Sequence, residues 1–319
     1  LVAGIYSTVK PSEPESIDSS CCRRAHIDAA GASQVCHGGD PVYLDVAAFT
    51  QFRNGLCDGG ISIFRKENIT PLVGDNVKIK LNQDGKTGVI SEILPRENSL
   101  IRPPVANISQ IAAVIAVENP KPNLQVLDKL ICCAENLGIK VLICINKSDL
   151  GDCSLYENIY KNAGFPVIVA SAETGEGVEE LRSLLRGKLT AFTGNTGVGK
   201  SSMLNRLCPN LQLATGEVSQ KLGRGRHTTR HVELFEACGG FVFDTPGFSR
   251  LEADEIKAGE LWQYFPEISS LHGECKFRTC NHIGEKGCLV KEAVDEGRIA
   301  ESRYENYKSL FNKLKEIKD

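Results

Sequence analysis

The residues with the clearest chemical potential form one short motif, G-x-x-x-x-G-K-S, at residues 194–201 of the 319-residue chain. Its glycines let backbone N–H groups turn inward around phosphate groups, and a helix N-terminus adds partial positive charge. Lys200 is placed to reach the β- and γ-phosphates of a nucleotide, and the Ser201 hydroxyl to bind Mg²⁺. The residues of this phosphate-binding loop (P-loop) are Gly194, Asn195, Thr196, Gly197, Val198, Gly199, Lys200, Ser201 and Ser202.

The flanking sequence supplies the elements that such a loop needs. Residues 188–193 have the pattern of a short buried strand, and residues 201–207 that of a helix start. A glycine-rich turn that binds nothing is the alternative interpretation. The strand–loop–helix order favours phosphate binding.

Composition places the chain among ordinary soluble globular proteins, with 41% hydrophobic and 24% charged residues. Its length predicts two or three domains. The longest apolar runs are too short to cross a bilayer, and no secretory signal is visible, so we expect a cytoplasmic protein. With a net charge of only −3, any contact with nucleic acid must come from local basic patches.

The thirteen cysteines are not expected to form a disulfide framework, because an enzyme with a P-loop belongs in a reducing compartment. Several lie in apolar patterns and are predicted to be buried thiols: Cys132, Cys133, Cys144, Cys208 and Cys238. A further group near the N-terminus consists either of metal ligands or of residues that occur there incidentally: Cys21, Cys22, Cys36 and His37.

The N-terminal part reads as a small β-domain. Residues 77–81 alternate with period two, residues 82–86 form a hairpin loop and residues 87–94 are the returning strand. Short strands joined by such turns predict a small barrel or sandwich. Four basic residues mark either an RNA-binding face or a solvated strand surface: Arg65, Lys66, Arg96 and Arg102.

Strands and helices alternate after a linker at residues 102–104. Strands are predicted at residues 111–117, 139–145 and 166–170, and helices at residues 124–137, 155–163 and 178–185. This alternation predicts a parallel sheet with helices on both faces, and ligands bind beyond the carboxyl ends of such strands.

Three further motifs follow predicted strands. They are N-K-S-D at residues 146–149, S-A-E at residues 171–173 and D-T-P-G at residues 244–247. The Asp149 carboxylate can accept both the N1–H and the N2–H₂ donors of guanine. Adenine lacks the 2-amino group, so Asp149 argues against an ATP-dependent enzyme.

With the P-loop, these motifs resemble those of the Ras-like GTPases. The resemblance implies that Asn146 contacts the base, that the Lys147 stem covers its face and that the Ala172 N–H contacts the guanine carbonyl. It also implies that Asp244 holds Mg²⁺ through water and that the Gly247 N–H senses the γ-phosphate. The implied nucleotide contacts outside the P-loop are Asn146, Lys147, Asp149, Ser171, Ala172, Asp244 and Gly247.

The order of the motifs is that of a circularly permuted GTPase, because the base-recognition motifs precede the P-loop and D-T-P-G comes last. Termini of compact domains lie close together, so such a rearrangement is tolerated. The segment after Gly247 then runs straight into the C-terminal region. We therefore expect nucleotide state to be coupled to whatever that region binds.

The basic segment 221–231 is either a solvated loop or the first switch. If it is the switch, it supplies a threonine as Mg²⁺ ligand, and we prefer Thr229 to Thr228 for this role. Many Ras-like enzymes orient water with a Gln after D-x-x-G, but this chain has Phe248 there. His227 is our candidate for that task, with an ordinary loop histidine as the alternative.

A second metal motif lies near the C-terminus, with the spacing C-x₄-C-x-H-x₅-C. Cys275, Cys280, His282 and Cys288 provide three thiolates and one imidazole, the ligand set of a closed structural zinc site. Redox or chance cysteines are the alternative. Residues 290–318 are predicted to be helical and amphipathic, with lysines that face either RNA or water: Lys308, Lys313, Lys315 and Lys318.

From about residue 63 to the end, the whole set resembles the ribosome small subunit-dependent GTPase A (RsgA) family. The resemblance implies an OB-fold β-barrel at 1–103, a permuted α/β GTPase domain at 104–250 and an α-helical zinc-binding domain at 251–319. Residues 10–60 lack the alternating strands that an OB-fold start would show.

The same resemblance implies a function. The protein would bind GTP, GDP, Mg²⁺ and one structural Zn²⁺. It would act as a monomer, away from membranes, on the 30S ribosomal subunit and its 16S rRNA late in assembly, with GTP hydrolysis stimulated by the subunit. The alternative is a GTP-switched RNA-binding scaffold with little hydrolysis of its own.

Overall fold

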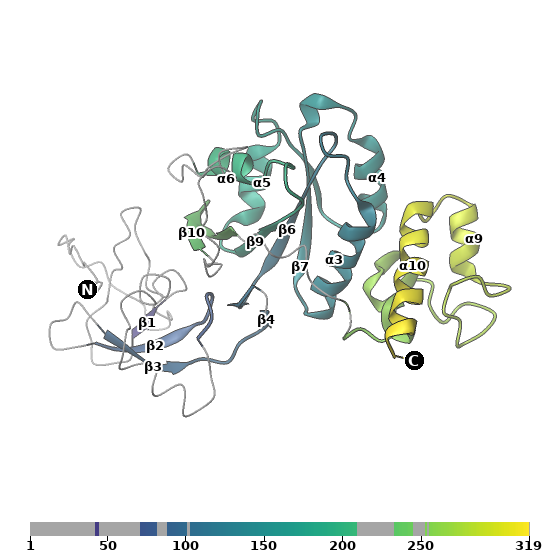
Figure 1. Cartoon of the computed structure of the whole chain (residues 1–319), viewed down its shortest axis with the longest axis horizontal. Coiled ribbons are helices and arrows are strands. Elements are labelled where there is room, and N and C mark those ends of the chain that lie inside the picture. The colour runs from purple at the N-terminus through teal and green to yellow at the C-terminus, as the bar shows by residue number, and fades with distance from the viewer. Residues whose placement is uncertain are drawn as a thin grey trace, which may run out of the picture. The chain divides into compact units, whose positions relative to one another are not determined.

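The computed structural model describes residues 42–44, 71–81, 88–100, 103–208, 233–244, 253 and 255–318. The chain divides into two compact units (Figure 1). One comprises residues 1–108 with 232–236, and the other residues 109–231 with 237–319. In the described part of the chain, no helix combines the length and apolar character that crossing a membrane requires.

The first unit contains a three-stranded antiparallel sheet in the order β1-β2-β3, formed by β1 (Val42–Leu44), β2 (Val77–Leu81) and β3 (Gly88–Ile93). A short pair, β4 (Ser99–Leu100) and β5 (Val105–Ala106), accompanies it. The predicted pairing of 77–81 with the following strand is confirmed. The predicted hairpin loop at residues 82–86, and residue 87 of the returning strand, lie outside the described residues.

A buried carboxylate fixes the turn that precedes β2. Asp75 is fully buried and accepts hydrogen bonds from Arg96 Nε (2.6 Å) and Nη2 (2.9 Å) and from the Leu72 N–H (2.7 Å). Gly74 has φ +103°, and a Cβ there would overlap the Ala106 carbonyl. Arg96 therefore holds this turn, which neither the RNA-face nor the solvated-surface interpretation anticipated.

The second unit is built on a parallel sheet in which the strands follow the order β11-β9-β6-β7-β8. Its parallel strands are β6 (Gln110–Ala116), β7 (Lys140–Asn146), β8 (Val167–Val169), β9 (Leu189–Thr193) and β11 (Gly240–Asp244). β10 (Glu233–Ala237) precedes β11 in the chain, and residues 233–236 of it fall in the first unit. β6 and β7 are almost continuous buried apolar runs, as expected for parallel strands covered on both faces.

Helices cover both faces of this sheet. α5 (Val178–Leu185) and α6 (Lys200–Leu207) pack on the face that carries Val114, Leu142 and Phe192. α3 (Leu124–Asn136) and α4 (Ser154–Asn162) contact β7 and β8. The Asn123 side chain caps α3, and Gly138, at φ +68°, follows its end. The predicted alternation of strands and helices is confirmed.

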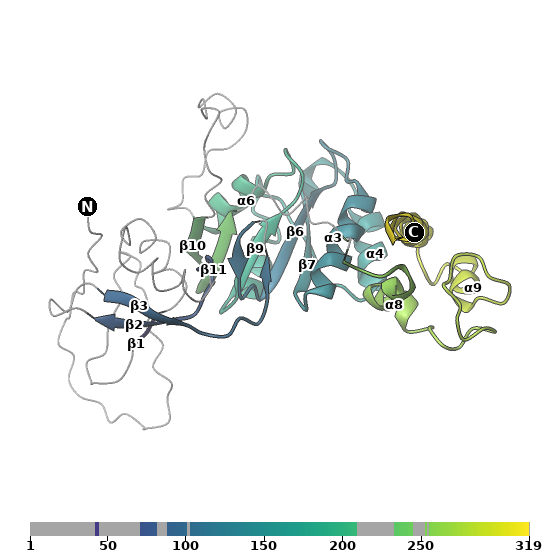
Figure 2. The ribbon, with the colours of Figure 1, turned by 60° about the horizontal axis from the view of Figure 1, so that its bottom comes forward.

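The C-terminal helices belong to the same second unit. They are η3 (Ala258–Tyr264), α8 (Pro266–Ser269), α9 (Leu289–Asp295) and α10 (Glu301–Lys318). α10 and η3 pack against α3, and α9 lies beyond them (Figure 2). The stretch predicted to be helical, residues 290–318, consists of two helices, α9 and α10, with a break between them. α9 ends before Gly297, whose φ of +74° is incompatible with a right-handed helix.

Candidate nucleotide site and candidate metal centre

The predicted nucleotide motifs gather at one edge of the sheet. Because β6, β7, β8, β9 and β11 are parallel, their carboxyl ends meet there. β9 leads into the P-loop, β7 into N-K-S-D and β8 into S-A-E. Asp244, the last residue of β11, pairs with Phe192 at the end of β9. The structure describes the backbone of Asp244 and not its side chain.

The P-loop presents an exposed rim at residues 195–197 and a buried anchor at Val198. Lys200 begins α6. Its Nζ donates to the Gly194 carbonyl (2.6 Å) and the Asn195 carbonyl (2.9 Å). The lysine side chain is thus folded over the loop whose N–H groups are predicted to hold phosphates.

Asn146 joins the P-loop to the base-recognition motifs. Its side chain is buried, with 1% exposed. Its Nδ2 donates to the Val198 carbonyl (2.8 Å), and its Oδ1 accepts from the Ala172 N–H (3.0 Å). Gly199 has φ +91°, and a Cβ there would overlap Asn146 Nδ2. This bracing role was not predicted from the sequence, and the predicted contact of Asn146 with the base stays a prediction.

Asp149 and Ser171 form the polar end of the base-recognition motifs. Asp149 is exposed, and its Oδ1 accepts a hydrogen bond from the fully buried Ser171 hydroxyl (2.5 Å). Glu176 holds both loops, because its carboxylate accepts from Ser148 Oγ (2.6 Å) and its carbonyl from the Ser171 N–H (3.0 Å). The role of Glu176 was not predicted from the sequence. The only signal was an acidic residue just before the predicted helix at 178–185.

Lys147 and a small cavity also lie at the carboxyl ends of the parallel strands. Lys147 has a left-handed backbone (φ 64°), and its Nζ donates to the Asn119 carbonyl. A cavity of about 100 Å³ lies beside the P-loop on the α3 side. Pockets that enclose whole ligands are several-fold larger, so this cavity is not the base pocket. Its lining includes Thr193, Gly194, Asn195, Pro120, Val126 and Leu130.

Several predicted site residues lie outside the described residues, and their roles stay predictions. They are His227, Thr229 and Gly247, together with Phe248.

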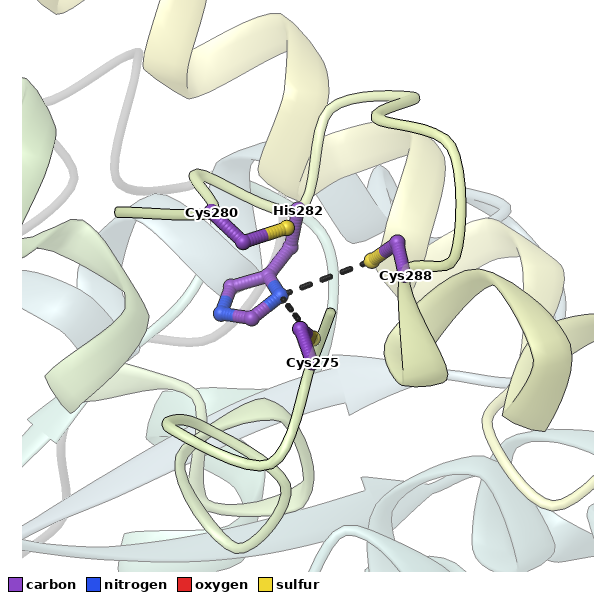
Figure 3. A group of neighbouring side chains, drawn as sticks. All are labelled: Cys275, Cys280, His282 and Cys288. Atoms are coloured by element: carbon purple, nitrogen blue, oxygen red, sulfur yellow. Dashed lines mark hydrogen bonds between the residues drawn. The ribbon is translucent and has the colours of Figure 1, made fainter. Parts of the chain in front are cut away.

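The predicted metal ligands converge in the loop between α8 and α9. Cys275, Cys280, His282 and Cys288 are all buried, and their ligand atoms lie within 4.8 Å of one another (Figure 3). His282 Nδ1 is 3.5 Å from both Cys275 Sγ and Cys288 Sγ. Ligands around tetrahedral zinc are separated by roughly 3.3–3.8 Å. The Cys₃His group is therefore consistent with zinc.

A second histidine orients the imidazole of the Cys₃His group. His282 Nε2 lies 2.9 Å from His272 Nδ1. His272 stacks on Trp262, with centroids 3.5 Å apart and ring planes within 5°. When His282 binds a metal through Nδ1, its Nε2–H donates to His272. His272 lies before the C-x₄-C-x-H-x₅-C motif, so motif spacing did not reveal it.

Glu285 shapes the loop between His282 and Cys288. Its carboxylate accepts from the N–H groups of Asn281 (2.8 Å), Ile283 (2.8 Å) and Gly284 (3.2 Å). Burial by itself would raise the pKa of Glu285, but hydrogen bonds from backbone N–H groups, including those of Asn281 and Ile283, lower the pKa below its usual value. The loop is thus held by one ionised side chain.

A buried ion-pair network joins α3 to the C-terminal helices. Arg303 on α10 is 1% exposed. Its Nη1 donates to Asp128 on α3 (2.6 Å), and its Nε (2.7 Å) and Nη2 (3.1 Å) donate to Glu267 on α8. Asp128 also accepts from Asn306 (2.6 Å) and Tyr160 (3.0 Å). This network was not predicted from the sequence.

The fold and site together define a P-loop GTPase with a permuted motif order. Comparison with known proteins agrees, because the model of the RsgA GTPase family matches residues 93–254. The chain therefore belongs to the RsgA GTPase family.

Relatives match over most of the chain. "Small ribosomal subunit biogenesis GTPase RsgA" of Geobacillus sp. strain WCH70 is 47% identical over 265 residues, 81% of this chain and 90% of the relative. The protein of that name from Caldanaerobacter subterraneus is 48% identical over 257 residues, 79% of this chain and 86% of the relative.

Two solved structures are also similar, each with a TM-score of 0.66. YjeQ from Thermotoga maritima is 39% identical, and the match covers 79% of this chain and 87% of YjeQ. YloQ, described as a circularly permuted GTPase, is 36% identical, and the match covers 79% of this chain and 84% of YloQ.

Proposed function

We propose that this protein hydrolyses GTP and acts in biogenesis of the small ribosomal subunit. The observation that carries the proposal is the hydrogen-bonded assembly of the P-loop, Asn146, Asp149 and Ser171 at one sheet edge. The names of its relatives support the ribosomal role.

Guanine recognition falls to the motifs at the ends of β7 and β8. Asp149 accepts the two adjacent donors of guanine, and the hydrogen bond from the Ser171 hydroxyl orients its carboxylate. Asn146 braces the pocket and contacts the base, the Lys147 stem covers its face and the Ala172 N–H contacts its carbonyl. ATP bound at the same site would leave one acceptor of Asp149 unpaired, because adenine lacks the 2-amino group.

The phosphates and Mg²⁺ belong to the P-loop and its neighbours. The N–H groups of residues 194–202 surround the phosphates, and Lys200 turns from the loop carbonyls to the phosphate oxygens. Mg²⁺, when bound, neutralises charge that develops on the phosphates. Its predicted ligands are Ser201, Thr229 and, through water, Asp244, while the Gly247 N–H contacts the γ-phosphate. His227 orients the attacking water.

The Cys₃His cluster holds one structural Zn²⁺. All four ligands are protein side chains, which leaves no open position for a reacting water. Zinc here stabilises the loop between Cys275 and Cys288 instead of taking part in hydrolysis.

The molecule is proposed to have three domains: an OB-fold at 1–103, the permuted GTPase domain at 104–250 and the zinc-binding domain at 251–319. Its partner is the 30S subunit with its 16S rRNA, which the relatives' names support. We propose a cytoplasmic monomer that does not contact membranes.

Single-turnover hydrolysis tests this function. We expect the protein to hydrolyse GTP and not ATP, and purified 30S subunits to accelerate the reaction. GTP binding with no hydrolysis, with or without 30S subunits, would favour the scaffold alternative. His227→Ala should slow hydrolysis with unchanged GTP binding, whereas the control His231→Ala should not.

A further inference from the structure

Two cysteines stand apart from the others in the described part of the chain. Cys208 directly follows α6, and Cys238 lies in the turn between β10 and β11 with φ +57°. Both are half-buried, whereas the other seven described cysteines are buried. The expectation that Cys208 and Cys238 are buried thiols is therefore wrong. Both pack at the margin of the core on the α5–α6 face of the sheet.

The two thiols contact each other beside a cation. Cys208 and Cys238 are hydrogen-bond partners. Arg182, on α5, donates through Nη1 to the Leu207 carbonyl (2.7 Å) and to Cys238 Sγ (3.7 Å). One guanidinium thus lies against both the end of α6 and the Cys238 sulfur.

This arrangement makes the two sulfurs unequal. The hydrogen bond from Cys208, helped by the charge of Arg182, lowers the pKa of Cys238 to about 7, although burial opposes them. The same hydrogen bond, together with burial, raises the pKa of Cys208. Cys238 is therefore the nucleophilic thiolate, and Cys208 is the thiol poised beside it.

We propose that Cys208 and Cys238 are a redox modification site that forms a reversible disulfide under peroxide. The Cys238 thiolate attacks hydrogen peroxide, so that an S–O bond forms, the O–O bond breaks and hydroxide leaves. Cys208 then attacks the sulfenic sulfur, the S–S bond forms and water leaves with the Cys208 proton. Two thiols lose one electron each, and peroxide gains both.

The position of the bond gives it a link to the nucleotide site. It joins the end of α6, which begins at Lys200, to the turn that leads into β11, which ends at Asp244. Both ends of the segment carrying His227 and Thr229 would then be tied together. Disulfides in reducing compartments are usually transient and redox-sensing, in keeping with a reversible bond here.

Peptide mapping of the full-length, zinc-loaded protein after peroxide treatment tests the proposal. We expect one cross-linked peptide pair containing Cys208 and Cys238, with loss of two hydrogen atoms and recovery of both thiols in dithiothreitol. In Cys208→Ser, Cys238 should stop at a sulfenic acid that dimedone traps. The control Cys153→Ser should form the bond as the unchanged protein does.

Measurements on the wild-type protein, without any variant, are sufficient to refute the proposal. It fails if both cysteines remain alkylatable after peroxide while circular dichroism shows a folded protein. It also fails if mapping shows Cys238 bonded to a different cysteine.

Discussion

Asn146 and Asp149 belong to one short loop but have different environments. Asn146 is buried and bonded to the P-loop and to Ala172, whereas Asp149 is exposed and its carboxylate bonds Ser171. Replacing Asn146 therefore disturbs the architecture of the site. Replacing Asp149 is the cleaner probe of base recognition.

Asp149→Asn should change nucleotide preference. The amide cannot accept both donors of guanine, so we expect GTP affinity to fall about 100-fold, the value of one or two hydrogen bonds to a charged group. Xanthine nucleotides, which replace the 2-amino donor with a carbonyl, should bind better than GTP. Competition binding measures both, with Asp152→Asn as the exposed control. Retained guanine preference would refute the role of Asp149.

His272→Ala should weaken zinc binding. His272 is the hydrogen-bond partner of His282 Nε2 and is held by Trp262. Loss of such a partner typically lowers metal affinity about 10- to 100-fold. Competition with a chromophoric chelator measures the affinity, and His272→Gln, which keeps an acceptor, should recover much of it. An unchanged affinity in His272→Ala would show that His272 does not position His282.

At the scale of elements, the joint between α3 and α10 depends on charge as well as apolar packing. Cys132 and Cys133 of α3 share a core with Tyr307 and Phe311 of α10. Arg303 lies inside that contact, with its guanidinium carbon 4.5 Å from the centroid of the Phe265 ring. Burial raises the pKa of Asp128, and the neighbouring Arg303 opposes that rise. Each charge in this joint therefore requires the other.

Arg303→Met should destabilise the protein strongly. The substitution keeps an apolar stem but leaves Asp128 and Glu267 buried without their cation. Breaking a buried pair in this way typically costs about 3–5 kcal/mol. Urea unfolding measures the change, and Arg298→Met, which removes an exposed pair with Glu296, should have little effect. Equal stability of the two variants would contradict the assigned role of the network.

Features that depend on residue type and local spacing can be predicted from the sequence. The buried runs at β6 and β7 and the spacing of Cys275, Cys280, His282 and Cys288 are local patterns, so they could be predicted. The pairing of Arg303 with Asp128 joins residues far apart in the chain, and either residue alone looks like an ordinary surface charge. The break at Gly297 was missed because apolar residues continue on both sides of it.

At the scale of the molecule, the permuted order connects the nucleotide site to the C-terminal helices by a short stretch of chain. β11 ends at Asp244, and by Ala253 and Ile256 the chain is already part of the core around α10. In this class of protein, the segment after D-x-x-G responds to the γ-phosphate. Nucleotide state and the C-terminal helices are therefore expected to be coupled.

The affinity for purified 30S subunits, with a non-hydrolysable GTP analogue and with GDP, tests this account most directly. Co-sedimentation at fixed salt measures it, with an ATP analogue as the control nucleotide. We expect the GTP analogue to increase affinity at least about fivefold, the lower end of typical coupling between sites, and the ATP analogue to have no effect. Equal affinity with the GTP analogue and with GDP would contradict the coupling, and no binding in either state would contradict the ribosomal role.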